Sequence, residues 1–329
     1  MRAAFADSQS DTDPLSGLVL REVPKPSPRP GWSTVRVVAS SLNMHDLWTL
    51  RGVGHPPERI PIILGCDAAG YDEAGNEVII HPVIADPDAG HGDETLDPNR
   101  ALLSEQHNGA FAEYLSVPTR NVVPKPAWLS FEQAACLPVA WTTAYRMLFT
   151  QAVIRPGDRV LVQGAGGGVA SAAISLAAAA GAVVYATSRS ERKRAEALTW
   201  GARAVLPTGE RLPERVDVVI ETVGEATWSH SLRSLRPGGT LVIAGATSGT
   251  NPPAELSRIF YLQQRILGST GGTRGELLGL LRLLEATGVR PVIDRTLPLE
   301  EIHKGFQLMI DGELTGKVVI TLPDPKDLS

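Results

Sequence analysis

The sequence predicts an α/β protein that contains a doubly wound parallel sheet and a second, β-rich part. The first observation is a strand, a glycine-rich turn, a helix and another strand in succession over residues 159–189. The second is a change of pattern near residue 125, where a β-rich, irregular segment gives way to alternating strands and helices. Such alternation is typical of a parallel sheet covered by helices on both faces.

The succession at residues 159–189 has the pattern of a dinucleotide-binding turn. A short apolar run at 160–162 predicts a buried strand, and the alanine-rich segment 169–180 predicts a helix that stops at Gly181. Backbone N–H groups at a helix N-terminus attract anions, and missing side chains let a phosphate approach. Because a strand and a helix flank the glycines, we favour this interpretation over a tight turn that binds nothing. The predicted contacts are Gly164, Gly166, Gly167, Gly168 and Val169.

Length, charge and cysteine content limit the classes of protein to which the chain can belong. A length of 329 residues favours two domains, and the net charge of −5 without a basic run predicts neither nucleic acid nor an anionic membrane as partner. Cys66 and Cys136 lie far apart, which favours a reducing compartment over a disulfide framework. The N-terminus shows no signal-peptide pattern, so a cytoplasmic location is expected. The apolar run 169–187 is rich in alanine and broken by Gly181, so it is not read as a membrane span.

The first part of the chain predicts strands with irregular connections. Strands are expected at 18–23, 33–40, 77–81, 111–117 and 121–123. The proline run 24–30 cannot join a sheet ladder. A helix is expected to open at Asn43, and the polar segment 86–100 is expected to be an exposed loop.

The second part predicts the alternating elements. A helix is expected at 134–150 with a break near Pro138, and Ser130 is a weak candidate for a capping box. Strands follow near 160, 183, 205, 216–222, 240–244 and 266–269, and helices at 169–180, from 192, and at 227–235, 254–262 and 275–287. A last strand is expected at 316–322.

The tip of the second strand of the dinucleotide unit indicates the cofactor. A site that prefers NADH usually has an acidic residue about 20 positions after the glycines, and none stands there. Ser188, Arg189 and Lys193 occupy the region instead, and cations with a hydroxyl suit a 2′-phosphate. The prediction is therefore NADPH, with a solvated helix face as the alternative.

The chain as a whole resembles the medium-chain dehydrogenase/reductase superfamily. The motifs are SLNMHDLWTLRG at 41–52, ILGCDAAG at 63–70, GAFAEYLSV at 109–117, LPVAWTTAY at 137–145, DVVIETVG at 217–224, LRPGGTLVIAG at 235–245 and GKVVI at 316–320. The resemblance implies a GroES-like catalytic domain at 1–124 plus 272–329 and an inserted Rossmann NADP(H)-binding domain at 125–271, with the active site between them. It also implies a homodimer or homotetramer, joined through the strand near 266–269.

Within that superfamily the resemblance is to the zinc-free, quinone oxidoreductase-like branch. Where zinc-dependent relatives have their ligands, this chain has Asn43, the pair Cys66 and Asp67, and a residue near Val139. Two thiolate ligands are thus missing, and no metal site is predicted. A new ligand set of Cys66, Asp67 and His45 is the alternative. Residues 86–107 contain no cysteine, so the structural zinc lobe is also absent, and His91 and His107 are expected at the surface.

The resemblance implies reduction of a quinone, or of a C=C bond conjugated to a carbonyl, by NADPH without metal. Asn43, His45 and Asp46 are the candidate catalytic residues. His45 would be a proton donor, unless it is a structural histidine, and Asp46 would mainly hold the loop. Thr143, Val223 and Gly245 would border the cofactor, and an apolar small-molecule substrate is expected from Trp48, Leu50, Trp141 and Phe260. The alternatives are a zinc-dependent alcohol dehydrogenase with altered ligands and an NADPH-binding sensor with little catalysis.

Overall fold

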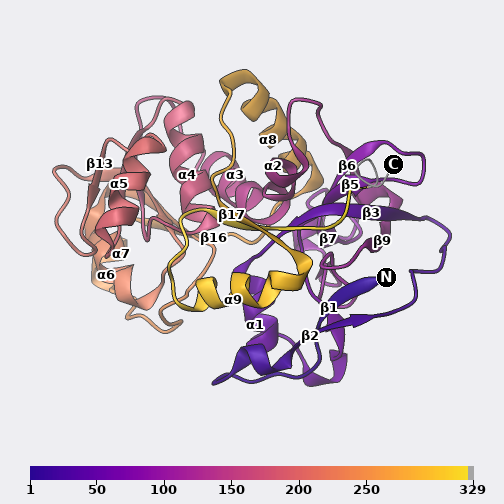
Figure 1. Cartoon of the computed structure of the whole chain (residues 1–329). Helices are drawn as coiled ribbons and strands as arrows, with labels where there is room; N and C mark the ends of the chain where they lie inside the picture. The colour runs from indigo at the N-terminus through magenta and orange to yellow at the C-terminus, as the bar shows by residue number, and fades with distance from the viewer. Residues whose placement is uncertain (325–329) are drawn as a thin grey trace. The chain divides into compact units, whose positions relative to one another are not determined.

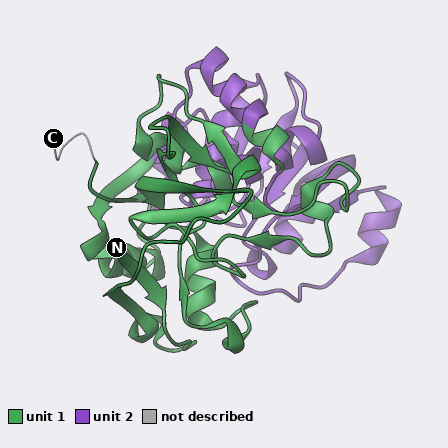
Figure 2. Cartoon of the chain, turned by 90° about the vertical axis from the view of Figure 1, so that its right-hand side faces the viewer, with its two compact units in different colours: residues 1–139, 273–277, 293–329 green, residues 140–272, 278–292 purple. Residues whose placement is uncertain are grey.

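The computed structural model describes residues 1–324 and divides the chain into two units (Figure 2). Unit 1 comprises residues 1–139, 273–277 and the segment from 293 onward, and unit 2 comprises residues 140–272 and 278–292. Residues 125–139 therefore group with unit 1, and most of the helix after residue 274 groups with unit 2. The domain boundaries at 124 and 271 stay predictions.

Unit 2 contains a parallel sheet with the strand order β13-β12-β11-β14-β15-β16. Its two edge strands, β13 and β16, are labelled in Figure 1. The chain starts in the middle at β11, moves outward to β13, then returns and continues from β14 to the other edge, which is the doubly wound arrangement that the alternation predicts. A ligand crevice is expected outside the carboxyl ends of β11 and β14, where the order reverses. The strands are β11 (Arg159–Val162), β12 (Val183–Thr187), β13 (Ala204–Leu206), β14 (Val216–Glu221), β15 (Leu235–Ile243) and β16 (Arg265–Gly268).

Helices connect these strands. The glycine turn leads into α4, whose residues from Ala170 to Ala177 are all buried, because small side chains let the helix approach the sheet. Gly181 follows the helix in the left-handed region with φ 84°. The helices that belong wholly or mostly to unit 2 are α3 (Thr142–Tyr145), α4 (Gly168–Ala179), α5 (Glu191–Thr199), α6 (Glu225–Ser234), α7 (Leu256–Tyr261) and α8 (Arg274–Thr287).

The helical stretch expected at 134–150 starts earlier and is irregular. The helix α2 (Phe131–Ala135) begins at Ser130, whose hydroxyl accepts from the Gln133 N–H at 3.2 Å, so the capping box is better formed than the sequence indicates. Wider π-helical turns cover residues 137–141 and 146–151, on either side of α3. Pro138 lies in the first of them, where its missing N–H removes a regular helical hydrogen bond.

Unit 1 joins both ends of the chain in one sheet. Its order is β10-β6-β5-β3-β18-β17, with β9 also paired to β3. The C-terminal strand β18 runs antiparallel to β3 and pairs Val319 with Ser41. Smaller sheets are β2-β1-β4 and β7-β8. The elements are β1 (Arg2–Ala6), β2 (Leu18–Glu22), β3 (Trp32–Ser41), α1 (Met44–Arg51), β4 (Ile62–Ile63), β5 (Ala69–Tyr71), β6 (Glu77–Ile80), β7 (Val83–Ile84), β8 (Ala101–Leu102), β9 (Tyr114–Pro118), β10 (Val122–Pro124), β17 (Ile293–Pro298), α9 (Ile302–Ile310) and β18 (Lys317–Thr321).

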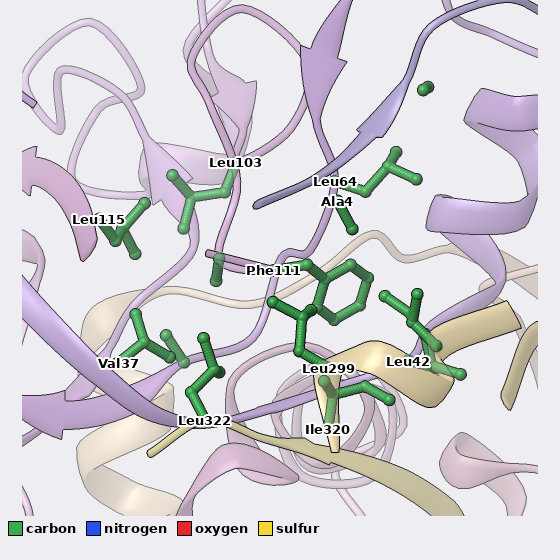
Figure 3. Close-up of a cluster of buried hydrophobic side chains, with 14 of the residues drawn as sticks. Ala4, Val37, Leu42, Leu64, Leu103, Phe111, Leu115, Leu299, Ile320 and Leu322 are labelled. Atoms are coloured by element: carbon green, nitrogen blue, oxygen red, sulfur yellow. The ribbon is translucent and has the colours of Figure 1, made fainter. Parts of the chain in front are cut away.

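The hydrophobic core of unit 1 packs around Phe111 (Figure 3). Leu64 and Ile320 belong to the same cluster, so this core connects residues from both ends of the chain. Phe111 also meets the ring of Phe306 edge to face, with centroids 6.3 Å apart. The pairing of β18 with β3 is therefore supported by side chains as well as by the ladder.

Several exposure predictions are wrong. The loop at 86–100 buries Glu94, Thr95 and Asp97, and Glu94 accepts from the Arg274 N–H at 2.6 Å. His91 is exposed as expected, but His107 is half-buried and packs on Trp32, with ring centroids 5.1 Å apart. A polar sequence predicts a loop correctly here, but local hydrogen bonds also allow such a loop to fold inward.

The apolar cleft predicted from large side chains is also not supported by their burial. Leu50 and Trp141 are fully buried in the interior, whereas Phe260 on α7 is 71% exposed. Within residues 1–324, no helix has the length and apolar character needed to cross a membrane.

Candidate functional site

The glycine turn after β11 has a backbone conformation that favours glycine at two positions, Gly164 and Gly166. Gly164 has φ 73°, and a Cβ placed on it would lie 2.6 Å from Cγ2 of Val223. Gly167 precedes α4 in an extended conformation, and a Cβ there would meet no atom within 4 Å. The N-terminus of α4 is therefore unobstructed within the described chain, as phosphate binding to helix N–H groups requires.

A buried polar network lies beneath this turn and was missed by sequence reasoning. Gln163 accepts from the Thr187 hydroxyl at 2.5 Å and donates to Ser231 Oγ at 2.9 Å. Ser231 donates onward to Glu221 Oε2 at 2.6 Å. These bonds link the carboxyl ends of β11, β12 and β14, so they fix the strand ends that surround the turn. A buried glutamine directly before the glycines was the only signal for it.

Glu221 then orders the loop after β14. Its Oε1 accepts from the N–H groups of Val223 at 2.8 Å and Gly224 at 3.1 Å. This holds Val223 against Gly164. Gly245 follows β15, where a Cβ would lie 3.1 Å from the Thr222 carbonyl oxygen. The predicted residues Val223 and Gly245 thus lie at the carboxyl ends of neighbouring strands, where open α/β sheets bind ligands.

The predicted 2′-phosphate residues gather at the end of β12. Ser188 is buried, and its Oγ accepts from the Ser190 N–H at 3.3 Å, while Ser190 caps α5 by accepting from the Lys193 N–H at 3.4 Å. The Lys193 side chain crosses Gly166, since a Cβ on that glycine would lie 2.6 Å from Lys193 Cδ. Arg189 is exposed, and its carbonyl oxygen accepts from Arg194 at 3.4 Å, but its side chain has no hydrogen bond or ion pair to any described residue. Thr143 is buried on α3, which packs against α4.

A second centre lies in unit 1 at the start of α1. Asp46 Oδ2 accepts from the Asn43 N–H at 2.9 Å, and Oδ1 accepts from the Gly65 N–H at 3.0 Å. Burial raises the pKa of Asp46 to about 6, against the opposing influence of His45 and of these bonds. Asp46 therefore ties the helix start to the segment after β4 and positions both.

The side chain of Asn43 is fully engaged by neighbours. Its Nδ2 donates to Asp67 Oδ2 at 2.8 Å and to the Ser41 carbonyl at 3.2 Å, while its Oδ1 accepts from Lys317 Nζ at 2.6 Å. An amide has two N–H donors, and both are used. Asn43 thus has no spare donor for a substrate in this arrangement and acts as part of a network.

Lys317, on β18, is the buried cation of this network and was not predicted. Its side chain is 3% exposed, and it donates to the Leu42 carbonyl at 2.7 Å and to Asp67 Oδ2 at 3.3 Å. Asp67 is fully buried and also accepts from Ser41 Oγ at 2.5 Å and from the Val139 N–H at 2.9 Å. The available signal was a lysine inside an apolar strand, because lysine is rarely buried without a partner.

His45 lies between a thiol and a carboxylate. Its Nδ1 is 3.3 Å from Cys66 Sγ, and its Nε2 is 3.1 Å from Glu105 Oε1. Burial raises the pKa of the Cys66 thiol, and the nearby Asp46 carboxyl adds to this. Glu105 is partly buried, yet its hydrogen bond with His45 holds the pKa of the carboxyl below its usual range. Sequence reasoning named Cys66 only as a possible metal ligand and missed Glu105.

The zinc site of the dehydrogenases that the sequence resembles does not fit these residues. The position near Val139 offers no ligand atom, and the Asn43 amide is held by Lys317 and Asp67. The alternative set of Cys66, Asp67 and His45 is wrong in one member, because Asp67 pairs with Lys317. The structure brings Asp46, rather than Asp67, to His45 and Cys66.

Comparisons with known proteins cover both units. The alcohol dehydrogenase GroES-like domain model matches residues 29–127, and the zinc-binding dehydrogenase model matches residues 168–286. Acryloyl-coenzyme A reductase of Metallosphaera sedula is 32% identical over 322 residues, which span 93% of this chain and 96% of that protein. The similarity thus extends along the whole chain and is not limited to the nucleotide-binding turn.

Two solved structures agree with this likeness. An NAD-dependent alcohol dehydrogenase superimposes with a TM-score of 0.90 at 33% identity, covering 98% of this chain and 100% of the other. Crotonyl-CoA carboxylase/reductase AntE in complex with NADP has a TM-score of 0.90 at 25% identity, covering 99% and 95%. Since the two are named for different cofactors, the preference of this chain depends on its own residues.

Proposed function

The chain belongs to the medium-chain dehydrogenase/reductase superfamily, and from that premise we propose that it transfers hydride from NADPH to a C=C bond conjugated to a carbonyl, or to a quinone, without a metal. NADPH, when bound, supplies the hydride. In an enone or an enoyl thioester the hydride adds to the β-carbon, the electron pair moves to the carbonyl oxygen, and a proton then joins the α-carbon.

The choice of NADPH rests on the end of β12. The Arg189 guanidinium has no partner among the described residues, and Lys193 lies along the glycine turn, so two cations flank the region where a 2′-phosphate is expected. Buried Ser188 adds a hydroxyl. A phosphate accepts charge-assisted hydrogen bonds from such groups, whereas the 2′-hydroxyl of NADH offers no negative charge to the Arg189 guanidinium. The AntE structure, which contains NADP, supports this choice.

The observation that carries the metal-free proposal is the network around Asn43. Where a zinc-dependent relative would polarise a carbonyl with the metal, this chain has an amide locked between an ammonium and a carboxylate. The developing enolate oxygen must then be stabilised by hydrogen-bond donors. His45, whose side chain is partly exposed, is the proposed proton donor.

The substrate class follows from the relatives' names together with the reaction. The M. sedula relative is named for acryloyl-coenzyme A and AntE for crotonyl-CoA, both conjugated enoyl thioesters. We therefore include enoyl-CoA thioesters beside quinones, 2-alkenals and enones as candidate acceptors.

We also propose a homodimer or homotetramer joined through β16. That strand is the last of its sheet order and pairs only with β15 among the described residues. An edge strand offers unpaired backbone groups to a second copy.

The test is an NADPH-oxidation screen over these four acceptor classes, with and without prior chelator treatment, in which the product is identified by mass and NMR. We expect saturation of the C=C bond, or quinol formation, at a rate that the chelator does not lower. Zinc that co-purifies and is required for turnover would contradict the metal-free mechanism. Binding of NADPH without turnover of any acceptor would instead favour a sensor.

A further inference from the structure

His45, Asp46 and Cys66 form a compact group of metal-ligating atoms. One ligand atom from each lies within 4.8 Å of the others. Cys66 Sγ is 3.3 Å from His45 Nδ1 and 3.8 Å from Asp46 Oδ1. Asp46 and Cys66 are fully buried, whereas His45 is partly exposed.

We propose that this group binds one divalent transition-metal ion of the Zn²⁺ class, and that the bound ion inhibits the reductase by occupying His45. The inhibition rests on the proposed function, because it requires His45 to be the proton donor. The binding site itself does not depend on that function.

The two distances from Cys66 Sγ suit a tetrahedral ion. Zinc bonds of about 2.3 Å to sulfur and about 2.0–2.2 Å to nitrogen or oxygen place tetrahedral ligand atoms about 3.6 Å apart. The two separations from Cys66 Sγ, 3.3 and 3.8 Å, bracket that value. Thiolate, imidazole and carboxylate are all zinc ligands, and three protein ligands leave one position for water.

The surroundings orient the ligands. Glu105 Oε1 engages His45 Nε2 at 3.1 Å, which leaves Nδ1 directed at Cys66. A carboxylate on the outer nitrogen of a histidine is the usual support of a metal ligand. Each Asp46 oxygen accepts one backbone N–H, and a carboxylate oxygen has a second lone pair for the ion.

This site differs from the zinc position that the family resemblance implies. Only Cys66 lies at a shared position, while His45 and Asp46 come from the first turn of α1. Asn43 and Asp67 remain in the network of Lys317. An ion here would therefore replace the contact between Cys66 and His45 and leave the Lys317 network intact.

The binding step has a simple balance and a route of entry. The Cys66 thiol gives its proton to solvent buffer as the sulfur–metal bond forms. His45 Nδ1 contributes its lone pair to the ion, so the ring keeps only its Nε2 proton and can no longer become the imidazolium that would donate a proton to the substrate. The side chains of His45 and Glu105 are 21% and 33% exposed. An ion would therefore reach the group from the exposed side of His45 and Glu105.

The test is a Co²⁺ titration of the full chain, followed by absorption spectroscopy. We expect one ion per chain and a thiolate-to-cobalt charge-transfer band. Cys66→Ser should abolish the band. Cys136→Ser is the matched control, because Cys136 is the other buried cysteine and bonds to the Glu132 carbonyl instead. A cobalt spectrum without the thiolate band, or an identical band in Cys66→Ser, would overturn the site.

A second variant tests the support by Glu105. Glu105→Gln removes the charge beside His45 and should weaken cobalt affinity roughly tenfold or more. If Cys66→Ser does not fold, the spectrum of the unchanged chain and the affinity of Glu105→Gln decide the matter. Unchanged affinity in Glu105→Gln would contradict the proposed ligand orientation.

Zn²⁺ inhibition separates this proposal from the proposed function. Zn²⁺ should stop NADPH-dependent turnover of the unchanged chain and of Cys136→Ser, and a chelator should restore it. Bound cobalt together with full activity in Zn²⁺ would overturn the inhibitory role. If no acceptor is reduced at all, the proposed function fails, and the cobalt band still establishes or refutes the site.

Discussion

The glycine turn of unit 2 and the side-chain network of Asn43, Asp67 and Lys317 in unit 1 are built in opposite ways. The turn consists of consecutive residues, and its unobstructed helix N-terminus comes from backbone groups and absent side chains. This network consists of side chains from distant segments, since Asn43 and Lys317 are 274 positions apart. A backbone-built site is a local property of the sequence, whereas a side-chain network exists only after the whole unit has folded.

The variant with the largest expected effect disrupts the side-chain network around Lys317. Lys317→Met would leave Asp67 as a buried carboxylate without its cation. Removing one partner of a buried ion pair costs about 3–5 kcal/mol, because the remaining charge is left uncompensated. We expect a loss of this size in the free energy of unfolding, measured by urea denaturation.

The matched control is Lys304→Met, which removes a lysine from the exposed pair with Glu301, whose side chains are 59% and 47% exposed. Surface pairs contribute about 0–1 kcal/mol. Equal losses in the two variants would show that the Lys317 network is not a buried electrostatic unit.

The contrast also explains what the sequence could predict. The doubly wound sheet, the turn at Gly164 and the fold of both units are confirmed, because each depends on periodicity and on motifs whose order is specific. The predicted cofactor residues keep their local neighbours in space, as Lys193 lying along Gly166 shows.

The network around Asn43 in unit 1 could be predicted from the sequence only in part. The motif at 41–52 pointed to Asn43, His45 and Asp46, but it could not show which donors are already used. That depends on Lys317 and Glu105, which reach α1 only through the pairing of β18 with β3 and the folding of the loop before β9. The metal alternative named Asp67, which follows Cys66 in the sequence. Adjacent side chains point to different neighbours, so Asp67 pairs with Lys317, and Asp46 is the carboxylate beside Cys66.

The second prediction tests the positive charge beside the glycine turn, at Arg189. Arg189→Ala should weaken NADPH binding about tenfold or more and leave NADH binding nearly unchanged, since a hydrogen bond to a charged group contributes about 1.5–3 kcal/mol. Titration of both cofactors measures it. Arg192→Ala, an exposed cation three positions later, is the control. Equal losses for NADPH and NADH would contradict a 2′-phosphate contact.

The smallest expected effect distinguishes a glycine that is needed for its backbone conformation, Gly164, from one that leaves space for a ligand, Gly167. Gly164→Ala forces a side chain into the left-handed region, which costs about 1–2 kcal/mol, and brings its Cβ to 2.6 Å from Val223. Gly167→Ser adds a side chain at an ordinary φ of −83° in open space, where serine is also a good helix N-cap.

Thermal unfolding should therefore register Gly164→Ala and not Gly167→Ser, whereas NADPH affinity should fall in both. In Gly167→Ser the hydroxymethyl group would occupy the space into which the phosphate has to move. Unchanged NADPH affinity in Gly167→Ser would place the pyrophosphate elsewhere and remove the functional reason for the open helix N-terminus. A stable Gly167→Ser with lost affinity would show that the turn binds through missing side chains, in contrast to the filled network of unit 1.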